Sequence, residues 1–302
     1  MRLYIFIGLV ILLVGMVFMG VYYHIINNYF VVGDTIVYDL FFTFIQTVSS
    51  NNFFMNYGLW DDTANTMILA NQNLANFIFE KAGLGPDRDN LAILDVGCGY
   101  GEQDLLWSSK MNKTCKITAV DISSTQITSA NQRRLKRNIL EENLEFVQGD
   151  AMRLKFQENT FDTVLSLESA FHYPDRPLFF KNVESLLKPG GVFAIGDIVI
   201  DNECKRGIFT NLFIRVFSDF LHIPEANLIT AKQWRDQIES TGLNVVEYHD
   251  ITSNTFVPYY KHFFYNYVEN KKWPRWVASR INNIFVKLQP FSYIVAVCRK
   301  PV

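Results

Sequence analysis

From Leu91 to the C-terminus, short apolar runs of strand length alternate with longer segments whose apolar residues recur at helical spacing. Parallel strands need a crossover between them, usually a helix, to bring the chain back to the same edge of the sheet. The alternation therefore predicts an α/β protein with a doubly wound, mainly parallel sheet of seven strands and helices on both faces. The strands are predicted at Leu91–Val96, Lys116–Asp121, Leu144–Gln148, Thr160–Ser166, Gly191–Val199, Leu243–Tyr248 and Phe291–Cys298, and the helices near Gly101–Ser109, Ser124–Asn138, Pro177–Leu187 and Ala231–Thr241.

Residues 25–85 precede this pattern and are rich in asparagine and aromatic side chains. A helix is predicted from about Thr63 to Ala82, because the apolar residues of this stretch fall on one helical face. Two later segments, about 201–228 and 252–288, carry many aromatic residues and stand outside the alternation. We predict that they cover a substrate; the alternative is that they are ordinary core-facing helices, the usual fate of aromatic stripes.

The first residues of the chain form an apolar run, with 21 consecutive uncharged residues from Leu3 to Tyr23. A helix needs about 20 apolar residues to cross a bilayer, so residues 1–24 are predicted to be a transmembrane anchor. The alternative is a cleaved secretory signal, whose apolar core of about 7–15 residues is shorter than this run.

The overall charge argues against one class of partner. The formal net charge is −2, so the chain has no excess of Lys and Arg to neutralise the phosphates of a nucleic acid. The four cysteines, Cys98, Cys115, Cys204 and Cys298, are far apart, without the close pairs of a zinc or redox motif. The sequence therefore predicts no nucleic-acid partner and no metal site.

The segment Leu94–Gly101 joins a predicted strand to a predicted helix and contains three alternating glycines. Glycine allows a backbone to approach a ligand that a Cβ would exclude, although such a turn can also be merely structural. Asp121, at the end of the next strand, follows the third glycine by 20 residues, a spacing at which a carboxylate accepts ribose hydroxyls. Asp95 and Glu102 put negative charge beside the turn, which disfavours a pyrophosphate and suits a cationic cofactor.

Four motifs in order resemble those of class I S-adenosylmethionine-dependent methyltransferases. They are Leu94–Gly101, Val120–Asp121, Gly149–Ala151 and Leu187–Gly191. This resemblance implies a Rossmann-like methyltransferase domain over residues 86–302, with S-adenosylmethionine as its cofactor. It implies a cofactor site of Gly97, Gly99 and Gly101 along the methionine part, with Asp95 beside them, Asp121 at the ribose, Ile122 beside the adenine, and Asp150 with Ala151 at the adenine edge.

The stretches Glu168–Arg176 and Asn56–Trp60 resemble the branch of this family that methylates sugars, polyketides, quinone precursors and sterols. In its sugar-methylating members a histidine at the position of His172 is implicated as a base, and Asp197 resembles the acid that assists it. A lone histidine here is about as often a residue that only hydrogen-bonds its loop. Tyr57 is implied to close over the cofactor, from within the N-terminal segment 25–85.

The sequence therefore predicts methyl transfer from S-adenosylmethionine to a hydroxyl of a small, hydrophobic or lipid-like acceptor, with His172 as general base. Three alternatives stay open: carbon or nitrogen methylation of a sterol, quinone or lipid amine; a nicotinamide-dependent dehydrogenase; and a membrane-anchored protein that binds a nucleoside without chemistry. The predicted location is a membrane, with the domain facing the cytosol where S-adenosylmethionine is made, although Arg2 alone favours the opposite orientation.

Overall fold

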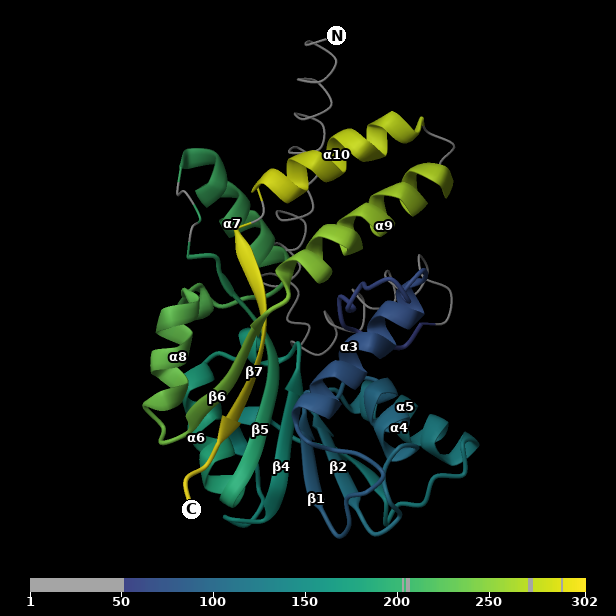
Figure 1. Ribbon diagram of the computed structural model, residues 1–302, viewed down its shortest axis with the longest axis vertical. Helices are drawn as coiled ribbons and strands as arrows, with labels where there is room; N and C mark the ends of the chain where they lie inside the picture. Colours follow the sequence, from purple (N-terminus) through teal and green to yellow (C-terminus); the bar gives the residue numbers. More distant parts are fainter. Residues whose placement is uncertain (1–51, 203, 205–206, 271–273, 289) are drawn as a thin grey trace.

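The computed structural model describes residues 52–202, 204, 207–270, 274–288 and 290–302. Its centre is a seven-stranded sheet in the order β3-β2-β1-β4-β5-β7-β6 (Figure 1). All the strand pairs are parallel except those made by β7, which runs against both of its neighbours. The strands are β1 Ala92–Val96, β2 Lys116–Asp121, β3 Leu144–Gln148, β4 Phe161–Leu167, β5 Leu187–Ile200, β6 Asn244–Asp250 and β7 Phe291–Arg299. The predicted seven-stranded, doubly wound fold is confirmed.

The strand order reverses beside β1. The chain proceeds outward from β1 to β2 and β3, then returns to the other side of β1 to form β4. The loops that leave β1 and β4 therefore diverge at the carboxyl edge of the sheet. This switch point is where an open α/β sheet binds its ligand.

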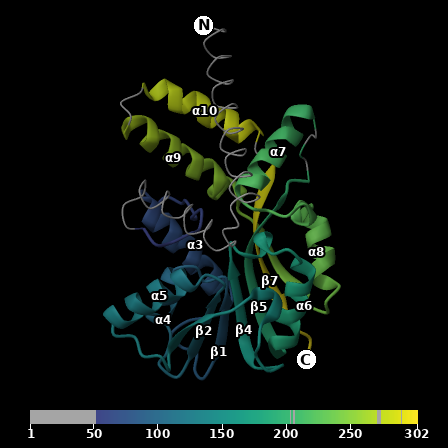
Figure 2. The same cartoon turned by 180° about the vertical axis from the view of Figure 1, so that it is seen from behind.

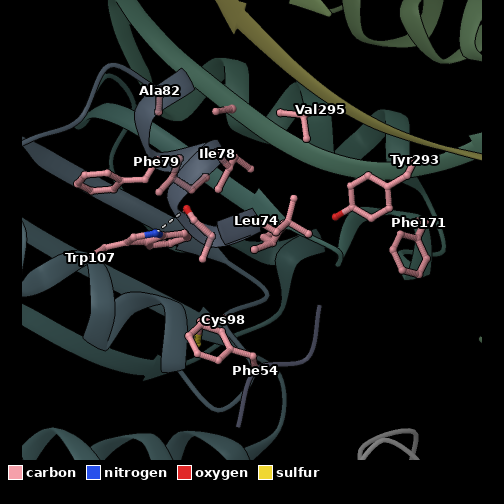
Figure 3. Close-up of a cluster of buried hydrophobic side chains, with 14 of the residues drawn as sticks. Phe54, Leu74, Ile78, Phe79, Ala82, Cys98, Trp107, Phe171, Tyr293 and Val295 are labelled. Carbon is pink, nitrogen blue, oxygen red and sulfur yellow. Dashed lines mark hydrogen bonds between the residues drawn. The ribbon is translucent and has the colours of Figure 1, made fainter. Parts of the chain in front are cut away.

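Helices cover both faces of the sheet and bury two separate apolar clusters (Figures 1 and 2). One face carries α3 Met67–Lys81, α4 Glu102–Ser108 and α5 Ser124–Lys136, and the other carries α6 Arg176–Leu186 and α8 Ala231–Glu239. The buried residues of α3 include Leu74 and Ile78, which face the sheet near Tyr293 and Val295 (Figure 3). The long apolar stripe of the sequence is thus the core-facing side of α3.

The chain before α3 is fastened to this helix by asparagine side chains. The Asn52 amide donates to Asn71 Oδ1 at 2.7 Å, and the Asn71 amide donates to Asn56 Oδ1 at 2.9 Å. All three side chains are buried, so these bonds satisfy amide groups that would otherwise be costly to remove from water. They hold residues 52–60 against the carboxyl edge of the sheet.

Three further helices lie beyond that same edge. They are α7 Ile208–Phe220, α9 Phe256–Asn270 and α10 Arg275–Leu288, and both views show them above the ends of the parallel strands (Figures 1 and 2). The pairing of Ile200 with Phe291 explains this position, because the chain leaves β5 and enters β7 at the same end. The two aromatic-rich segments of the sequence therefore lie over the switch point.

The predicted fold class needs one correction. The proposed membrane anchor, residues 1–24, lies outside the described residues. Within the described part, no helix is long and apolar enough to span a bilayer. Both α3 and α9 have 15 residues, fewer than the about 20 that are needed. The fold class that the structure supports is therefore the seven-stranded sheet with its helices, without a transmembrane helix among the described residues.

The contact between α3 and α4 gives a test of the core. The Trp107 indole N–H donates to the Ala75 carbonyl at 2.9 Å, and its ring stacks on Phe79 (Figure 3). We expect Trp107→Phe to lower the free energy of unfolding by about 2 kcal/mol, because it leaves a buried gap and removes a buried donor. Urea unfolding measures this change. The matched control is Trp276→Phe, at a side chain that is 64% exposed, and an equal loss in both variants would contradict the expectation.

Candidate active site

The glycine-rich turn after β1 is tightly folded against β2 and β4. The backbone N–H groups of Gly97 and Cys98 both donate to the Val120 carbonyl, at 2.8 and 3.1 Å. Gly97 has a φ of 86°, and a Cβ there would lie 2.2 Å from the Cβ of Ser169. Only glycine fits this position, so the turn and the loop after β4 form one continuous floor.

Asp121 is fixed at the end of β2, beside this floor. Its Oδ2 accepts from the Gly99 N–H and its Oδ1 from the Ser123 N–H, both at 2.9 Å. A carboxylate oxygen has more than one acceptor site, and the side chain is partly exposed. Asp121 is therefore oriented to accept hydroxyls, as the ribose role predicted from the sequence requires.

The predicted adenine contacts also meet at this edge. The Gly149 N–H donates to the Asp121 carbonyl at 2.9 Å, which joins the ends of β2 and β3. Ile122 is 48% exposed, and Asp150 caps the short turn after β3 by accepting from the Met152 N–H at 2.8 Å. Ala151 is buried beside it. The structure thus brings Asp121, Ile122 and Asp150 to one edge of the sheet, where the Ile122 side chain forms an exposed apolar surface.

Two of the predicted cofactor residues lie away from that surface. A Cβ on Gly101 would come within 2.2 Å of the Phe146 ring, so this glycine is needed where α4 packs on β3. Asp95 is fully buried, and its Oδ2 accepts from the Gln103 amide at 3.1 Å. Burial raises the pKa of Asp95 to about 7, and burial together with the nearby charge of Asp95 raises the pKa of Asp104 well above its usual range. Asp95 therefore lies in the interior of the domain, away from the exposed surface at Ile122.

His172 lies in a short 3-10 turn after β4, from Ala170 to His172. Its Nδ1 lies 3.3 Å from the His222 carbonyl oxygen and is the donor in that contact, and the ring packs on Phe171. Burial lowers the pKa of His172 to about 4, because the imidazolium loses its hydration, and the acceptor carbonyls of His222 and Leu221 only partly offset this. The ring is therefore neutral at physiological pH.

Asp197 does not play the part predicted from the sequence in this arrangement. Its Oδ2 accepts from the Arg176 guanidinium at 3.1 Å and from the Trp234 indole at 2.7 Å, and all three side chains are fully buried. A carboxylate against His172 would raise the pKa of the histidine, whereas the pKa is lowered. Asp197 instead neutralises a buried arginine.

Arg176 connects Asp197 to the loop that carries His172. It donates to the Asn227 carbonyl at 3.4 Å. The Asn227 amide in turn donates to the carbonyls of Phe171 and Tyr173, at 3.0 and 2.7 Å. Asp197 therefore acts on the site through the conformation of residues 171–173.

Glu168 is the main site residue that the sequence reasoning passed over. Its Oε1 accepts from the Tyr57 backbone N–H and from the Tyr293 hydroxyl, both at 2.8 Å. Burial raises the pKa of Glu168 to about 8, so the carboxyl is mostly protonated at neutral pH. The signal in the sequence was a single acidic residue placed directly after a buried apolar strand.

Tyr57 links the N-terminal segment to the helices above the site. Its ring makes edge contacts with Phe256 and Tyr259 of α9, with centroids 4.9 and 4.7 Å apart. Trp60 continues the contact, packing on His262 and donating from its indole to the Tyr57 carbonyl at 3.0 Å. These contacts cover the end of β4 with aromatic rings.

The fold and site together define a class of protein. A doubly wound sheet, a glycine-rich turn at its switch point and a carboxylate at the end of the second strand form a site for an adenosine-containing cofactor. The residues present fit S-adenosylmethionine: Asp121 presents acceptor oxygens beside the glycine-rich turn, and Ile122 offers an exposed apolar side for an adenine ring.

Comparison with known proteins agrees with this class. A family model described as a methyltransferase domain matches residues 87–272. The erythromycin 3''-O-methyltransferase of Saccharopolyspora erythraea is 34% identical over 209 residues, which cover 68% of this chain and 67% of that protein. The sterol 24-C-methyltransferase of Kluyveromyces lactis is 30% identical over 188 residues, which cover 61% of this chain and 48% of that protein.

A solved geranyl diphosphate methyltransferase in complex with S-adenosylmethionine has the same fold. The TM-score is 0.66 at 14% identity, over 82% of this chain and 99% of that one. The chain therefore belongs to the methyltransferase domain family, and it is an S-adenosylmethionine-dependent methyltransferase of small molecules.

The ribose role of Asp121 has a direct test. We expect Asp121→Ala to weaken S-adenosylhomocysteine binding about 10- to 100-fold, because hydrogen bonds to a charged acceptor are lost. Isothermal titration calorimetry measures this, with a thermal melt to verify folding. Asp236→Ala, at an exposed position on α8, should bind as the wild type does. A change of less than threefold in Asp121→Ala would show that other groups hold the ribose.

The raised pKa of Glu168 predicts how stability depends on pH. Between about pH 4.5, where a free glutamate ionises, and pH 8, the folded protein binds a proton that the unfolded chain has lost. The wild type should therefore lose stability relative to Glu168→Gln as the pH rises through this range. Melting temperatures at pH 5, 6.5 and 8 check this, with Glu158→Gln at an exposed loop as the matched control. A difference that does not vary with pH would refute the raised pKa.

Proposed function

We propose that this enzyme transfers a methyl group to a hydroxyl oxygen of a hydrophobic small molecule. The observation that carries the proposal is the aromatic cover over the end of β4, where Tyr57, Phe256 and Tyr259 contact one another. Aromatic rings bind apolar and ring-containing molecules with large contact area. The similarity to an enzyme named as an O-methyltransferase of erythromycin supports an oxygen acceptor.

Catalysis on this scaffold depends mostly on positioning. S-adenosylmethionine, when bound, supplies an already reactive methyl group on a sulfonium centre. The chain fixes the cofactor site through the floor at Gly97 and the carboxylate of Asp121, and the aromatic cover excludes water from the acceptor side. Holding an acceptor oxygen in line with the methyl group is then the principal source of rate acceleration.

The general base named from the sequence is His172, and this role stays a prediction. A neutral imidazole has one acceptor nitrogen, and the contact of Nδ1 with the His222 carbonyl leaves Nε2 in that form. The pKa of about 4 makes the ring a weak proton acceptor, however.

Carbon methylation is the second candidate function. The relative named as a sterol 24-C-methyltransferase is almost as similar to this chain as the oxygen methyltransferase is. The same aromatic cover suits a sterol skeleton, so the two reactions are distinguished by identifying the methylated atom in the product.

A labelling experiment separates these candidates. The full chain is incubated with methyl-labelled S-adenosylmethionine and, in separate reactions, a macrolide with a free sugar hydroxyl, a sterol, and 2-naphthol. We expect label in a methyl ether of at least one acceptor, and product NMR identifies the methylated atom. Label on carbon supports the second candidate, and no transfer to any of the three would remove hydrophobic alcohols as the acceptor class.

A further inference from the structure

Glu168 occupies the switch point of the sheet. It directly follows β4, and the next residue, Ser169, donates from its hydroxyl to the Val96 carbonyl at 2.8 Å. Ser169 also packs so closely on Gly97 that no Cβ fits between them. Glu168 is thus one residue from the glycine floor of the cofactor site, on the side where β1 and β4 diverge.

The two oxygens of this carboxyl have different surroundings. Oε1 accepts both hydrogen bonds, from the Tyr57 N–H and the Tyr293 hydroxyl. Within the described residues, Oε2 accepts no hydrogen bond, and it is absent from the buried oxygens that lack a partner. The side chain is partly exposed. One oxygen therefore anchors the carboxyl, and the other has no hydrogen-bond donor among the described residues.

The backbone at Glu168 is held in an unfavourable conformation. Its φ is 54°, in the left-handed region that side chains disfavour. The bond from its N–H to the Gly196 carbonyl, at 2.9 Å, continues the pairing of β4 with β5 and maintains this geometry. Strain of this kind is characteristic of functional sites, where the surrounding structure imposes it.

Phenol groups surround this carboxyl on the elements that pack against it. They are Tyr57 of the N-terminal segment, Tyr259 of α9 and Tyr293 of β7, and the pKa of each is raised by burial. Asp197 adds a negative charge on the far side of Tyr293, and it is neutralised by Arg176. The phenols remain neutral at the pH values where Glu168 titrates, so Glu168 is the group here that changes charge.

We infer that the free oxygen of Glu168 binds the acceptor hydroxyl and removes its proton during methyl transfer. This inference rests on the proposed oxygen methylation. The hydroxyl oxygen forms a bond to the methyl carbon as the carbon–sulfur bond breaks, and its electron pair stays on the sulfur. The hydroxyl proton goes to Oε2, which gives a neutral carboxylic acid, a methyl ether and S-adenosylhomocysteine. Glu168 then releases the proton to solvent, so the cycle balances.

Glu168 and His172 predict different pH profiles, and this difference is the test. If Glu168 is the base, turnover rises about tenfold per pH unit below a midpoint near 8, because only the ionised carboxyl accepts a proton. If His172 is the base, its pKa of about 4 makes turnover flat from pH 6 to 9. Turnover of the full chain is measured over this range with the aliphatic alcohol that gains label, because its own hydroxyl does not ionise between pH 6 and 9.

Three variants sharpen the measurement. Glu168→Gln keeps a carbonyl oxygen for the Tyr57 and Tyr293 donors but cannot accept a proton, so we expect a loss of about 100-fold or more with cofactor binding unchanged. Tyr293→Phe removes a donor that stabilises the ionised carboxyl, so the pH midpoint should move upward. Glu158→Gln, in an exposed loop, should match the wild type in rate and profile. Wild-type turnover that is flat with pH, or a Glu168→Gln rate within threefold of the wild type, would overturn the inference.

Infrared titration tests whether Glu168 contacts the acceptor, independently of which atom of the acceptor is methylated. The protonated carboxyl band that is present in the S-adenosylhomocysteine complex of the wild type and missing from Glu168→Gln should titrate near pH 8. It should shift when 2-naphthol is added. If methyl transfer goes to carbon or nitrogen, the proposed function fails but a shifted band still places Glu168 against the acceptor. If the position of the band does not change when the alcohol is added, Glu168 does not contact the alcohol.

Discussion

The reversal of strand order beside β1 is the constraint on which the rest of this enzyme depends. Parallel strands must all end at one edge, and the reversal makes the loops after β1 and β4 diverge there. This edge carries the glycine floor from β1, the carboxylate of Asp121 from β2 and the strained Glu168 from β4. The chain leaves β5 and enters β7 at the same edge, so α7, which follows β5, and α9 and α10, which precede β7, lie beyond it.

Burial of ionisable groups shapes the chemistry of this edge. Three carboxyls lie in or beneath this edge, and each is stabilised differently after removal from water. Asp197 pairs with a buried arginine, Asp95 is buried beside Asp104 with a raised pKa, and Glu168 has its pKa raised to about 8. The first two carboxyls are fully buried beneath the edge. The third leaves an oxygen free, which is why the catalytic inference falls on Glu168.

Much of the fold and the cofactor side of the site was predictable from local sequence. Strand boundaries agree to within one or two residues except at β5, which begins at Leu187 because that residue pairs with Phe161 ahead of the predicted start at Gly191. The acceptor side was less predictable. The apparent partnership of His172 with Asp197 came from a resemblance, and the structure instead pairs Asp197 with Arg176. The apolar run at the N-terminus predicted a transmembrane helix at residues outside the described part, and no described helix is long and apolar enough to span a bilayer.

The sequence by itself determined the alternation of strands and helices, the glycine turn and the carboxylate that follows it, because each is encoded within a few neighbouring residues. Those local patterns were enough to predict a nucleoside cofactor, and their resemblance to a known family implied the class of reaction. Only the tertiary structure brought Glu168 into contact with Tyr57 and Tyr293 at the switch point. Tyr57, Glu168 and Tyr293 come from segments more than a hundred residues apart, and their contact depends on how β4, β7 and the N-terminal segment pack. The pKa of a carboxyl follows from burial and hydrogen bonds, and neither exists until these segments meet.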